Sequence, residues 1–232
     1  MEEKFHYCKG CLSSTTSIFS ILTTEDLNYI DDNKSVNSYK KGDVLYREGN
    51  RILGCYCVNS GILKIYKTGL DGKEQIIAFA QKGDITGYRS VLSNEPACTT
   101  AEVIEDANIC FIPSNVMFTF VKKNSDFALA LMKLTCKELN TANSYIKDIA
   151  QKTVRERLAE ILIMLEDSFG RDSDGFLTIS LTRAELSNIV GTATESVIRL
   201  LSEFKDDKLI SISGKKIKIL NKTVLNKIAN PF

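Results

Sequence analysis

The sequence is poor in histidine: His6 is the one histidine among 232 residues. Histidine is the commonest general base and a common metal ligand near neutral pH. A single histidine excludes a multi-histidine metal site and leaves little basis for histidine-based catalysis. The sequence also shows no pairing of a nucleophile with a base and no glycine-rich phosphate loop ahead of a helix. It therefore predicts that the chain is not an enzyme.

Long apolar runs are lacking too. No continuous apolar stretch approaches the roughly 20 residues that a membrane-spanning helix needs. The first residues, MEEKFHYCKGC, lack the basic-then-apolar order of a secretory signal. We therefore expect a cytoplasmic protein with no membrane partner. Its seven cysteines, an odd number, are then expected to be thiols or metal ligands rather than a disulfide framework.

Neither sign of charge is in excess over the whole chain, whose formal net charge is +1. No global basic field therefore indicates a polyanionic partner. The distribution is uneven, because residues 182–232 contain nine lysines and arginines against five acidic residues, a local charge of +4. This excess points weakly to nucleic acid at the C-terminal end.

Glycine is concentrated in one region, since residues 36–112 hold eight of the thirteen glycines. Short runs rich in β-branched and aromatic residues lie between them, as around Leu63 and Ile65, with turns such as that at Gly69 and Gly72. This pattern predicts an antiparallel sandwich or small barrel of unstated strand order. Before it, a short helical pattern has Thr23 or Thr24 as its expected N-cap.

A long helix of about 25 residues is predicted near residues 123–150. Two interpretations of its apolar side are open. The stripe packs on the protein's own sheet, or it packs against the same helix of a second copy in a homodimer. In the second case the polar Glu138 and Thr141 would weaken the seam, as regulated dimerisation requires. The stripe consists of Phe127, Leu131, Leu134, Ala142, Tyr145 and Ile149.

Two short helices are predicted after residue 181. The pattern T-x-x-E at Thr182 and Glu185 is a capping box that starts the first, and Gly191 ends it. A glycine-containing turn between two short helices is typical of a helix-turn-helix, and a hairpin with Gly214 at its tip would add a wing. The second helix has an apolar side of Val197, Leu200, Leu201 and Phe204, opposite Thr194, Glu195, Ile198, Arg199 and Ser202.

The outer side of the second helix has two interpretations. Glu195 and Arg199 form an i, i+4 ion pair on a solvated surface, or Glu195 closes a capping box with Thr192. Alternatively, the face enters a DNA major groove, where glutamate accepts from cytosine, arginine forks onto guanine and Ile198 meets a thymine methyl. The exposed apolar side chain favours DNA. The candidate DNA-binding residues are Arg183, Thr194, Glu195, Ser196, Ile198, Arg199, Lys215 and Lys216.

This order of parts resembles the CRP/FNR family of bacterial transcription regulators, and LTRAELSNIVGTATESVIRLL is similar to the family's recognition segment, E-[ST]-V/I-x-R. The resemblance implies an α+β fold with a cyclic-nucleotide-binding-like β-roll (jelly roll), a long dimerisation helix and a winged helix-turn-helix. It implies a homodimer that binds near-palindromic double-stranded DNA, often as an activator that contacts RNA polymerase. Thr194 and Ile198 differ from the residues of the cAMP-responsive and oxygen-sensing branches.

The expected divisions are an N-terminal cysteine-containing segment at 1–35, a β-roll sensor domain at 36–122, a dimerisation helix at 123–150 and a DNA-binding domain at 151–232. A second functional hypothesis is an effector-binding regulatory module that acts through protein contacts rather than DNA. Such a module would not need the wing.

The residues at the two expected nucleotide-binding positions argue against cAMP as the effector. Where the resemblance places the ribose-binding glutamate and the phosphate-binding arginine, the chain has Tyr88 and either Cys98 or Thr99, and Arg89 lies beside the wrong residue.

The resemblance to the oxygen-sensing branch instead implies a [4Fe-4S] iron–sulfur cluster held by Cys8, Cys11 and Cys110, with Ser17 at the place of the remaining cysteine. His6, Glu25 and Asp26 are other possible ligands near Ser17. A haem, an unknown small ligand or no effector are the alternatives. We interpret Cys55, Cys57 and Cys136 as packing residues.

Overall fold

The computed structural model describes residues 17–230 and contains two compact units. One unit comprises residues 1–72 and 76–140, and the other comprises residues 73–75 and 141–232. No helix within the described range is both long and apolar enough to cross a bilayer.

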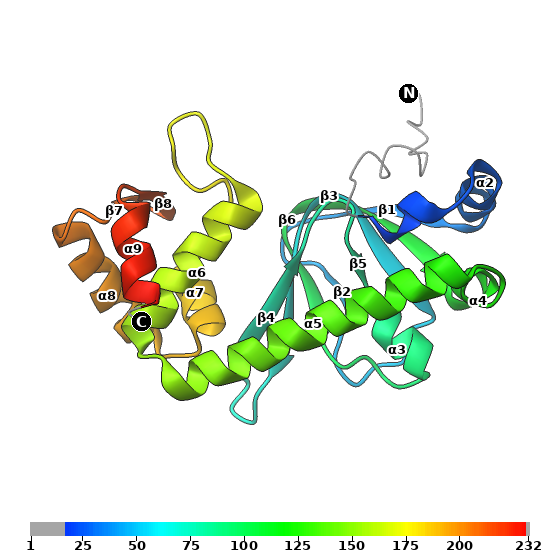
Figure 1. The fold of residues 1–232 in the computed structure, drawn as a ribbon, viewed down its shortest axis with the longest axis horizontal. Helices are drawn as coiled ribbons and strands as arrows, with labels where there is room; N and C mark the ends of the chain where they lie inside the picture. The colour runs from blue at the N-terminus through cyan, green and yellow to red at the C-terminus, as the bar shows by residue number, and fades with distance from the viewer. Residues whose placement is uncertain (1–16, 231–232) are drawn as a thin grey trace. The chain divides into compact units, whose positions relative to one another are not determined.

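The first unit is built on a six-stranded antiparallel sheet (Figure 1). Its main path is β1-β6-β3-β4, while β2 pairs with β6 and β5 pairs with β3. The predicted β-roll is therefore confirmed, and the strand order, which the sequence did not give, is now visible. The strands are β1 Ser35–Tyr39, β2 Val44–Tyr46, β3 Gly54–Thr68, β4 Glu74–Ala80, β5 Ile85–Thr86 and β6 Thr100–Pro113.

The sheet has a separate apolar core on each face. Successive side chains of a strand point to opposite faces, so Tyr56 and Val58 belong to one core and Cys55 and Cys57 to the other. The first core contains strand residues and aromatic tyrosines such as Tyr46. The second core is shared with the helices of this unit: η1 Ile18–Ile21, α2 Thr24–Asn33, α3 Tyr88–Ser93, α4 Ser114–Lys123 and the first part of α5 Ser125–Gln151.

The first two helices of the described range begin with side-chain caps. Thr23 is the N-cap of α2, and its hydroxyl accepts a hydrogen bond from the backbone N–H of Asp26, as the sequence allowed. Ser17 is the N-cap of η1 and is buried. Phe19 and Leu22 then pack into the same core as Cys57 and Cys110, which anchors this segment to the sheet.

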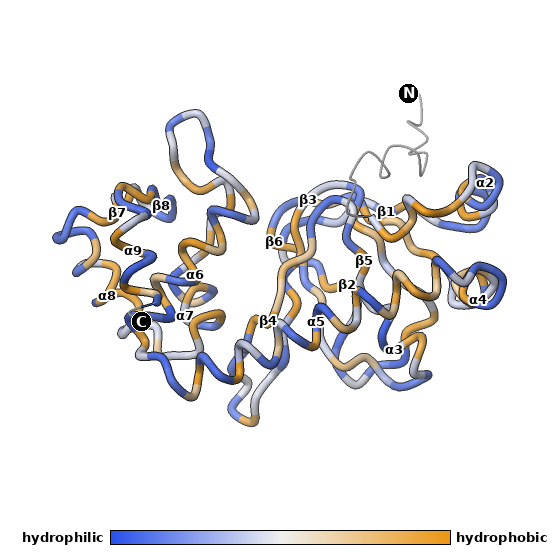
Figure 2. The backbone as a smooth tube through the Cα atoms, viewed as in Figure 1, coloured by the Kyte–Doolittle hydropathy of each residue, from blue (hydrophilic) through white to orange (hydrophobic). Residues whose placement is uncertain are grey.

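The long helix α5 is confirmed, but its apolar residues divide differently from the prediction. Phe127 and Leu131 are buried in the core of their own unit, with Leu134 packed against them. This half of the predicted stripe therefore covers the protein's own sheet. A second set of apolar residues on α5 is exposed. Figure 2 shows hydrophobic and hydrophilic residues alternating along this helix. The exposed set consists of Leu129, Met132, Cys136, Leu139 and Ile146.

The second unit is a small winged helical domain (Figure 1). Its core comes from the buried sides of its helices, including Leu158, Leu162 and Phe204. The helix α6 ends at Gly170, which is its C-cap. The elements are α6 Val154–Phe169, α7 Arg183–Val190, α8 Thr194–Asp206, β7 Ile210–Ser213, β8 Lys216–Ile219 and α9 Lys222–Ala229.

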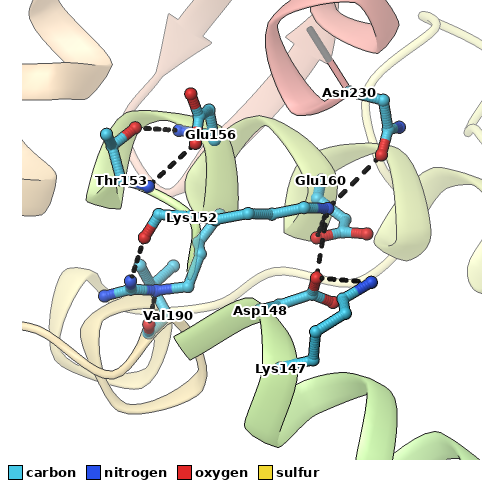
Figure 3. Close-up of polar contacts among 9 residues, drawn as sticks. Lys147, Asp148, Lys152, Thr153, Glu156, Glu160, Val190 and Asn230 are labelled. Carbon is cyan, nitrogen blue, oxygen red and sulfur yellow. Dashed lines mark hydrogen bonds and ion pairs between the residues drawn. The ribbon is translucent and has the colours of Figure 1, made fainter. Parts of the chain in front are cut away.

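A polar network joins the end of α5 to α6 and the C-terminal residues (Figure 3). The ammonium of Lys152 lies 2.8 Å from a carboxylate oxygen of Glu160, 3.5 Å from Asp148 Oδ1 and 3.3 Å from the side-chain oxygen of Asn230. Burial by itself lowers the pKa of Lys152, but the hydrogen bond and charge of Glu160 outweigh it and raise the pKa overall. Lys152 therefore stays charged and ties three segments together.

Candidate DNA-binding site

The first helix of the helix-turn-helix starts with the predicted capping box. The Thr182 hydroxyl accepts from the backbone N–H of Glu185 at 3.1 Å, and the Glu185 carboxylate accepts from the backbone N–H of Thr182 at 2.6 Å. Both interactions satisfy N–H groups that a helix start leaves without partners. The helix ends at Gly191, whose φ of +72° lies in the left-handed region that favours glycine. The prediction of this helix is confirmed at both ends.

The turn between the two helices is held by Arg157 of α6. Its guanidinium donates to the backbone carbonyls of Val190 at 3.0 Å, Gly191 at 3.4 Å and Lys152 at 2.7 Å. The side chain is buried, so these carbonyls replace the water that it would lose. Sequence reasoning missed Arg157, because its partners are carbonyls that leave no trace in the residue pattern.

A second bond links the two helices directly. The hydroxyls of Ser187 in α7 and Thr194 at the start of α8 lie 3.0 Å apart. Ser187 also donates to the carbonyl of Ala184 at 2.8 Å, which leaves its oxygen to accept from Thr194. Thr194, a predicted DNA contact, therefore helps to fix where α8 begins.

The inner side of α8 matches the prediction. Val197, Leu200, Leu201 and Phe204 are all buried at the spacing i, i+3, i+4 and i+7. These side chains fix the rotation of the helix about its axis, because turning it would expose them to water. The residues on the opposite side must then face outward.

The outer side of α8 repeats the same spacing two residues earlier. Glu195, Ile198, Arg199 and Ser202 are exposed there, and Ile198 keeps 48% of its surface accessible. An exposed β-branched residue between two charged ones is not needed for the core of this domain. The site residues that the sequence placed on one outer face are therefore together.

The ion pair on this face differs from the predicted one. Arg199 Nη1 lies 2.5 Å from Glu203 Oε1, one turn toward the C-terminus, and within the described chain no ion pair of Glu195 occurs. The alternative of a capping box between Thr192 and Glu195 is wrong, because the N-cap of α8 is Ala193 and makes no side-chain cap bond. Glu195 is thus left at an exposed helix start.

The predicted wing is a two-residue turn between β7 and β8, in which Gly214 has φ +59° and Lys215 is exposed. Lys216, another predicted DNA contact, is engaged in an ion pair within this domain. Its ammonium lies 3.0 Å from Asp172, and its hydrogen bond holds the pKa of that carboxyl below the usual value. Arg183 Nη2 donates to the carbonyl of Gly214 at 3.1 Å, so this predicted DNA contact also fastens the wing.

The cysteines of the candidate cluster are only partly within the described residues. Cys8 and Cys11 lie outside them, as does His6. Cys110 is buried on β6, while the Ser17 hydroxyl accepts from the backbone N–H of Phe19 at 3.4 Å. Between residues 17 and 230, no group of three or more histidines, cysteines or carboxylates is arranged to hold a metal ion.

The remaining cysteines divide into two kinds. Cys55 and Cys57 are buried, in agreement with the packing interpretation. Cys136 is exposed on α5, so it does not pack in the core of its own chain as the packing interpretation expected.

Comparison with known protein families finds one matching domain model in each unit. Residues 36–124 match the model of the cyclic nucleotide-binding domain, and residues 156–228 match the Crp-like helix-turn-helix domain. The chain belongs to the CRP/FNR family of transcription regulators.

Individual proteins are similar in sequence to this chain over nearly its whole length. The transcriptional activator protein Anr of Pseudomonas aeruginosa is 29% identical over 227 residues, which are 96% of this chain and 92% of that protein. The fumarate and nitrate reduction regulatory protein of Vibrio cholerae is 27% identical over 226 residues, 96% of this chain and 90% of the relative. The structure of FixK2 from Bradyrhizobium japonicum has a TM-score of 0.75 at 25% identity, covering 84% and 96% of the two chains.

The chain is thus a DNA-binding transcription regulator of the CRP/FNR type, and the prediction that it is not an enzyme is confirmed. Within the β-roll, the position expected for the ribose-binding glutamate of the cyclic-nucleotide branch is Tyr88, which is 2% exposed. Burial raises the pKa of Tyr88. Arg89 pairs with Glu138 at 3.3 Å, and Thr99 is buried. Tyr88 and either Cys98 or Thr99 therefore stand where the resemblance places the glutamate and the arginine of the cyclic-nucleotide branch.

Proposed function

We propose that this CRP/FNR regulator reads DNA with the outer face of α8, which lies in the major groove. The observation that carries the proposal is the exposure of Glu195, Ile198 and Arg199 on a helix whose opposite side is fully buried. Base contacts of a helix-turn-helix come from the N-terminal turns of the second helix. Glutamate accepts from cytosine N4, arginine donates twice to guanine, and the isoleucine meets a thymine methyl.

The elements around α8 position it on the phosphate backbone. Lys215 at the wing tip is exposed and is the direct phosphate contact we propose. Lys216, Arg183, Thr194 and Ser196 lie near the same surface, where the hydrogen bonds of the first three hold the wing and the start of α8. Phosphate contacts fix register and orientation, while base contacts select sequence.

The regulator acts as a homodimer through the outward stripe of α5. Leu129, Met132, Cys136, Leu139 and Ile146 follow one another at steps of three, four, three and seven residues. This is the heptad spacing of a two-stranded coiled coil, and Asn143 falls at a core position, where a polar residue sets register. A second copy of the same helix is the occupant that this spacing fits. Two-fold symmetry then requires near-palindromic operators.

The sensed effector is an iron–sulfur cluster bound through cysteine thiolates of the first unit. Cys8, Cys11 and Cys110 supply three of them, and such a cluster is an electron carrier that is held by four cysteines. The fit at Ser17 is poor, because its hydroxyl already caps η1 and serine is a weaker ligand than a thiolate. The cyclic-nucleotide alternative has less support, given the buried Tyr88.

The same core connects the cluster side of the sheet to α5. Cys110 belongs to one apolar cluster with Phe127 and Leu131, the first two buried residues of the long helix. A change at Cys110 therefore alters the packing of the helix start, and the seam on its other side responds. Such an effector changes the equilibrium between two arrangements of the dimer only if it binds them with different affinity. On DNA, the dimer acts on transcription by contacting RNA polymerase.

Selection of binding sites from random duplex DNA tests the proposal, with the anaerobically purified full chain as bait. We expect a near-palindromic motif whose half-sites are centred about one helical turn, roughly 10 base pairs, apart. Failure to enrich any sequence would contradict sequence-specific recognition. Enrichment of an asymmetric single site by a monomer would contradict the dimer.

A further inference from the structure

Side chains from three other segments donate hydrogen bonds to each backbone carbonyl of residues 188–192, where α7 ends and the turn to α8 follows. Arg157 of α6 donates to the carbonyls of Val190 and Gly191. The last carbonyls of a helix have no partner within the helix, so these side chains complete the hydrogen bonding of the turn. The other donors are Gln75 Nε2 to Asn188, Tyr145 Oη to Ile189 and Lys73 Nζ to Thr192.

Two of these donors are also bonded to each other. Gln75 Nε2 donates to Tyr145 Oη at 2.7 Å, and Tyr145 Oη donates to the carbonyl of Ile189 at 2.7 Å. Burial raises the pKa of Tyr145, so its hydroxyl keeps the proton that it donates. Gln75 and Tyr145 therefore form one chain of hydrogen bonds that ends on the last turn of α7.

Both side chains lie close to the turn itself. A Cβ atom added to Gly191 would be 3.4 Å from Gln75 Oε1 and 3.6 Å from Tyr145 Oη. Space for little more than a methyl group therefore separates the turn from the two side chains. A shift of the turn toward them is limited by this contact, and a shift away from them breaks their hydrogen bonds.

Gln75 and Tyr145 belong to the second unit, but the elements that carry them continue into the first. Gln75 is the second residue of β4, whose residues 76–80 belong to the first unit. Tyr145 lies on α5, whose residues 125–140 also belong to the first unit. The two side chains thus connect the turn to a strand and a helix that both extend into the sensor unit.

We propose that Gln75 and Tyr145 are positioning residues for base recognition, because they hold the turn from which α8 starts. The inference rests on the proposed reading of DNA by the outer face of α8. It assigns to that function two residues that lie outside the helix-turn-helix. Each acts through the carbonyl that it holds rather than by touching DNA.

Tyr145→Phe and Gln75→Met are the variants that test this role. Each removes one donor while keeping nearly the same shape and the same charge. The other two donors are less suitable: Arg157 is buried and its loss would affect folding, while Lys73 is an exposed cation whose removal would itself weaken attraction to phosphates. Ser144→Ala is the matched control, because it removes an exposed hydroxyl from the adjacent residue of α5.

The experiment measures the Kd of the full chain, purified anaerobically, for the selected operator and for a duplex of scrambled sequence. We expect Tyr145→Phe and Gln75→Met to bind the operator about two- to twelve-fold more weakly than the wild type, as the loss of one net hydrogen bond implies. Binding to the scrambled duplex should not change, because it depends on phosphate contacts that carry no sequence information. Ser144→Ala should match the wild type on both duplexes.

Amide hydrogen exchange gives a second measure of the same role. In both variants the amides of residues 191–197 should exchange faster, while those of α6 stay as in the wild type. Circular dichroism reports whether each variant is folded, and because the two variants remove different donors, one decides the question if the other does not fold.

Equal weakening on both duplexes would indicate a purely structural role and overturn the proposal. Variants that keep the full wild-type preference for the operator would overturn it as well, while leaving base reading by α8 intact. A wild type that does not distinguish the operator from the scrambled duplex would contradict base reading by α8 itself, and this inference with it.

Discussion

Arg199 and Glu203 form an ion pair of 2.5 Å along the outer face of α8. We propose that the guanidinium of Arg199 contacts guanine, so DNA must compete with Glu203 for this guanidinium. The Arg199 side chain is 68% exposed, and exposed pairs of this kind contribute about 0.2–1 kcal/mol. The competition is therefore weak enough for a base to win.

Glu203→Gln is expected to strengthen operator binding, because it releases Arg199 and removes a negative charge near DNA. Loss of the pair alone corresponds to roughly a 1.4- to five-fold lower Kd. The measurement is a gel-shift titration on the selected operator.

Asp207→Asn is the matched control for that prediction. Glu203 and Asp207 both pair with Arg155, at 3.4 Å and 3.3 Å. The Asp207 variant therefore removes the same charge and a partner of Arg155, while the pair of Arg199 with Glu203 stays in place. If both variants strengthen binding equally, general charge explains the effect and the release of Arg199 does not.

Leu201→Ala and Ile198→Ala should separate the two faces of α8. Leu201 is 1% exposed, so its truncation leaves a cavity and lowers the free energy of unfolding by about 2–5 kcal/mol. Ile198 is 48% exposed, so the free energy of unfolding should change by less than about 0.5 kcal/mol while preference for thymine falls. Urea denaturation and operator binding measure the two effects. A large stability loss in Ile198→Ala would place that side chain inside the protein.

Thr182→Ala removes the cap of α7 and is expected to lower the free energy of unfolding of the second unit by about 1 kcal/mol. The backbone N–H of Glu185 loses its acceptor, and the carboxylate of Glu185 loses the hydroxyl that it accepts from. Chemical denaturation followed by circular dichroism measures the change. Replacement by serine keeps the oxygen and should restore most of the stability.

Mild oxidation with diamide should join two copies through Cys136. This thiol occupies a core position of the proposed heptad, which faces its symmetry mate in a parallel dimer, and disulfides tolerate Cα separations of about 4.4–6.8 Å. A non-reducing gel should show a covalent dimer for the wild type and for Cys98→Ser, but none for Cys136→Ser. A dimer band that survives in Cys136→Ser would place the interface elsewhere.

The sequence predicted best where a local pattern is decisive. The capping box of α7, its glycine end and the buried side of α8 depend on residues within one or two turns, and these three predictions were confirmed, whereas the capping box at the start of α8 was wrong. The sequence left two interpretations of α5 open, because this helix has two apolar sides and periodicity does not say which one meets the sheet. Phe127 and Leu131 are buried, while Met132 and Leu139 face outward.

Contacts between segments that lie far apart in the chain could not be predicted from the sequence. Asp172 and Lys216 pair across 44 positions, and Arg157 holds a turn more than 30 residues away. Cys57 and Cys110 are neighbours only because β3 pairs with β6 in one particular register. A single sequence does not specify strand register across the sheet, so the thiols were read as unrelated.

The central claim is that Arg199 on α8 reads a base in the operator. The most direct measurement is the binding of wild type and Arg199→Ala to the selected operator and to every single base-pair substitution of it, with Lys205→Ala as a charge control on the same helix. We predict that Arg199→Ala weakens binding by about 1–3 kcal/mol and loses discrimination at one G·C pair in each half-site, while Lys205→Ala keeps the pattern. An Arg199→Ala variant with unchanged discrimination at every position would contradict the account.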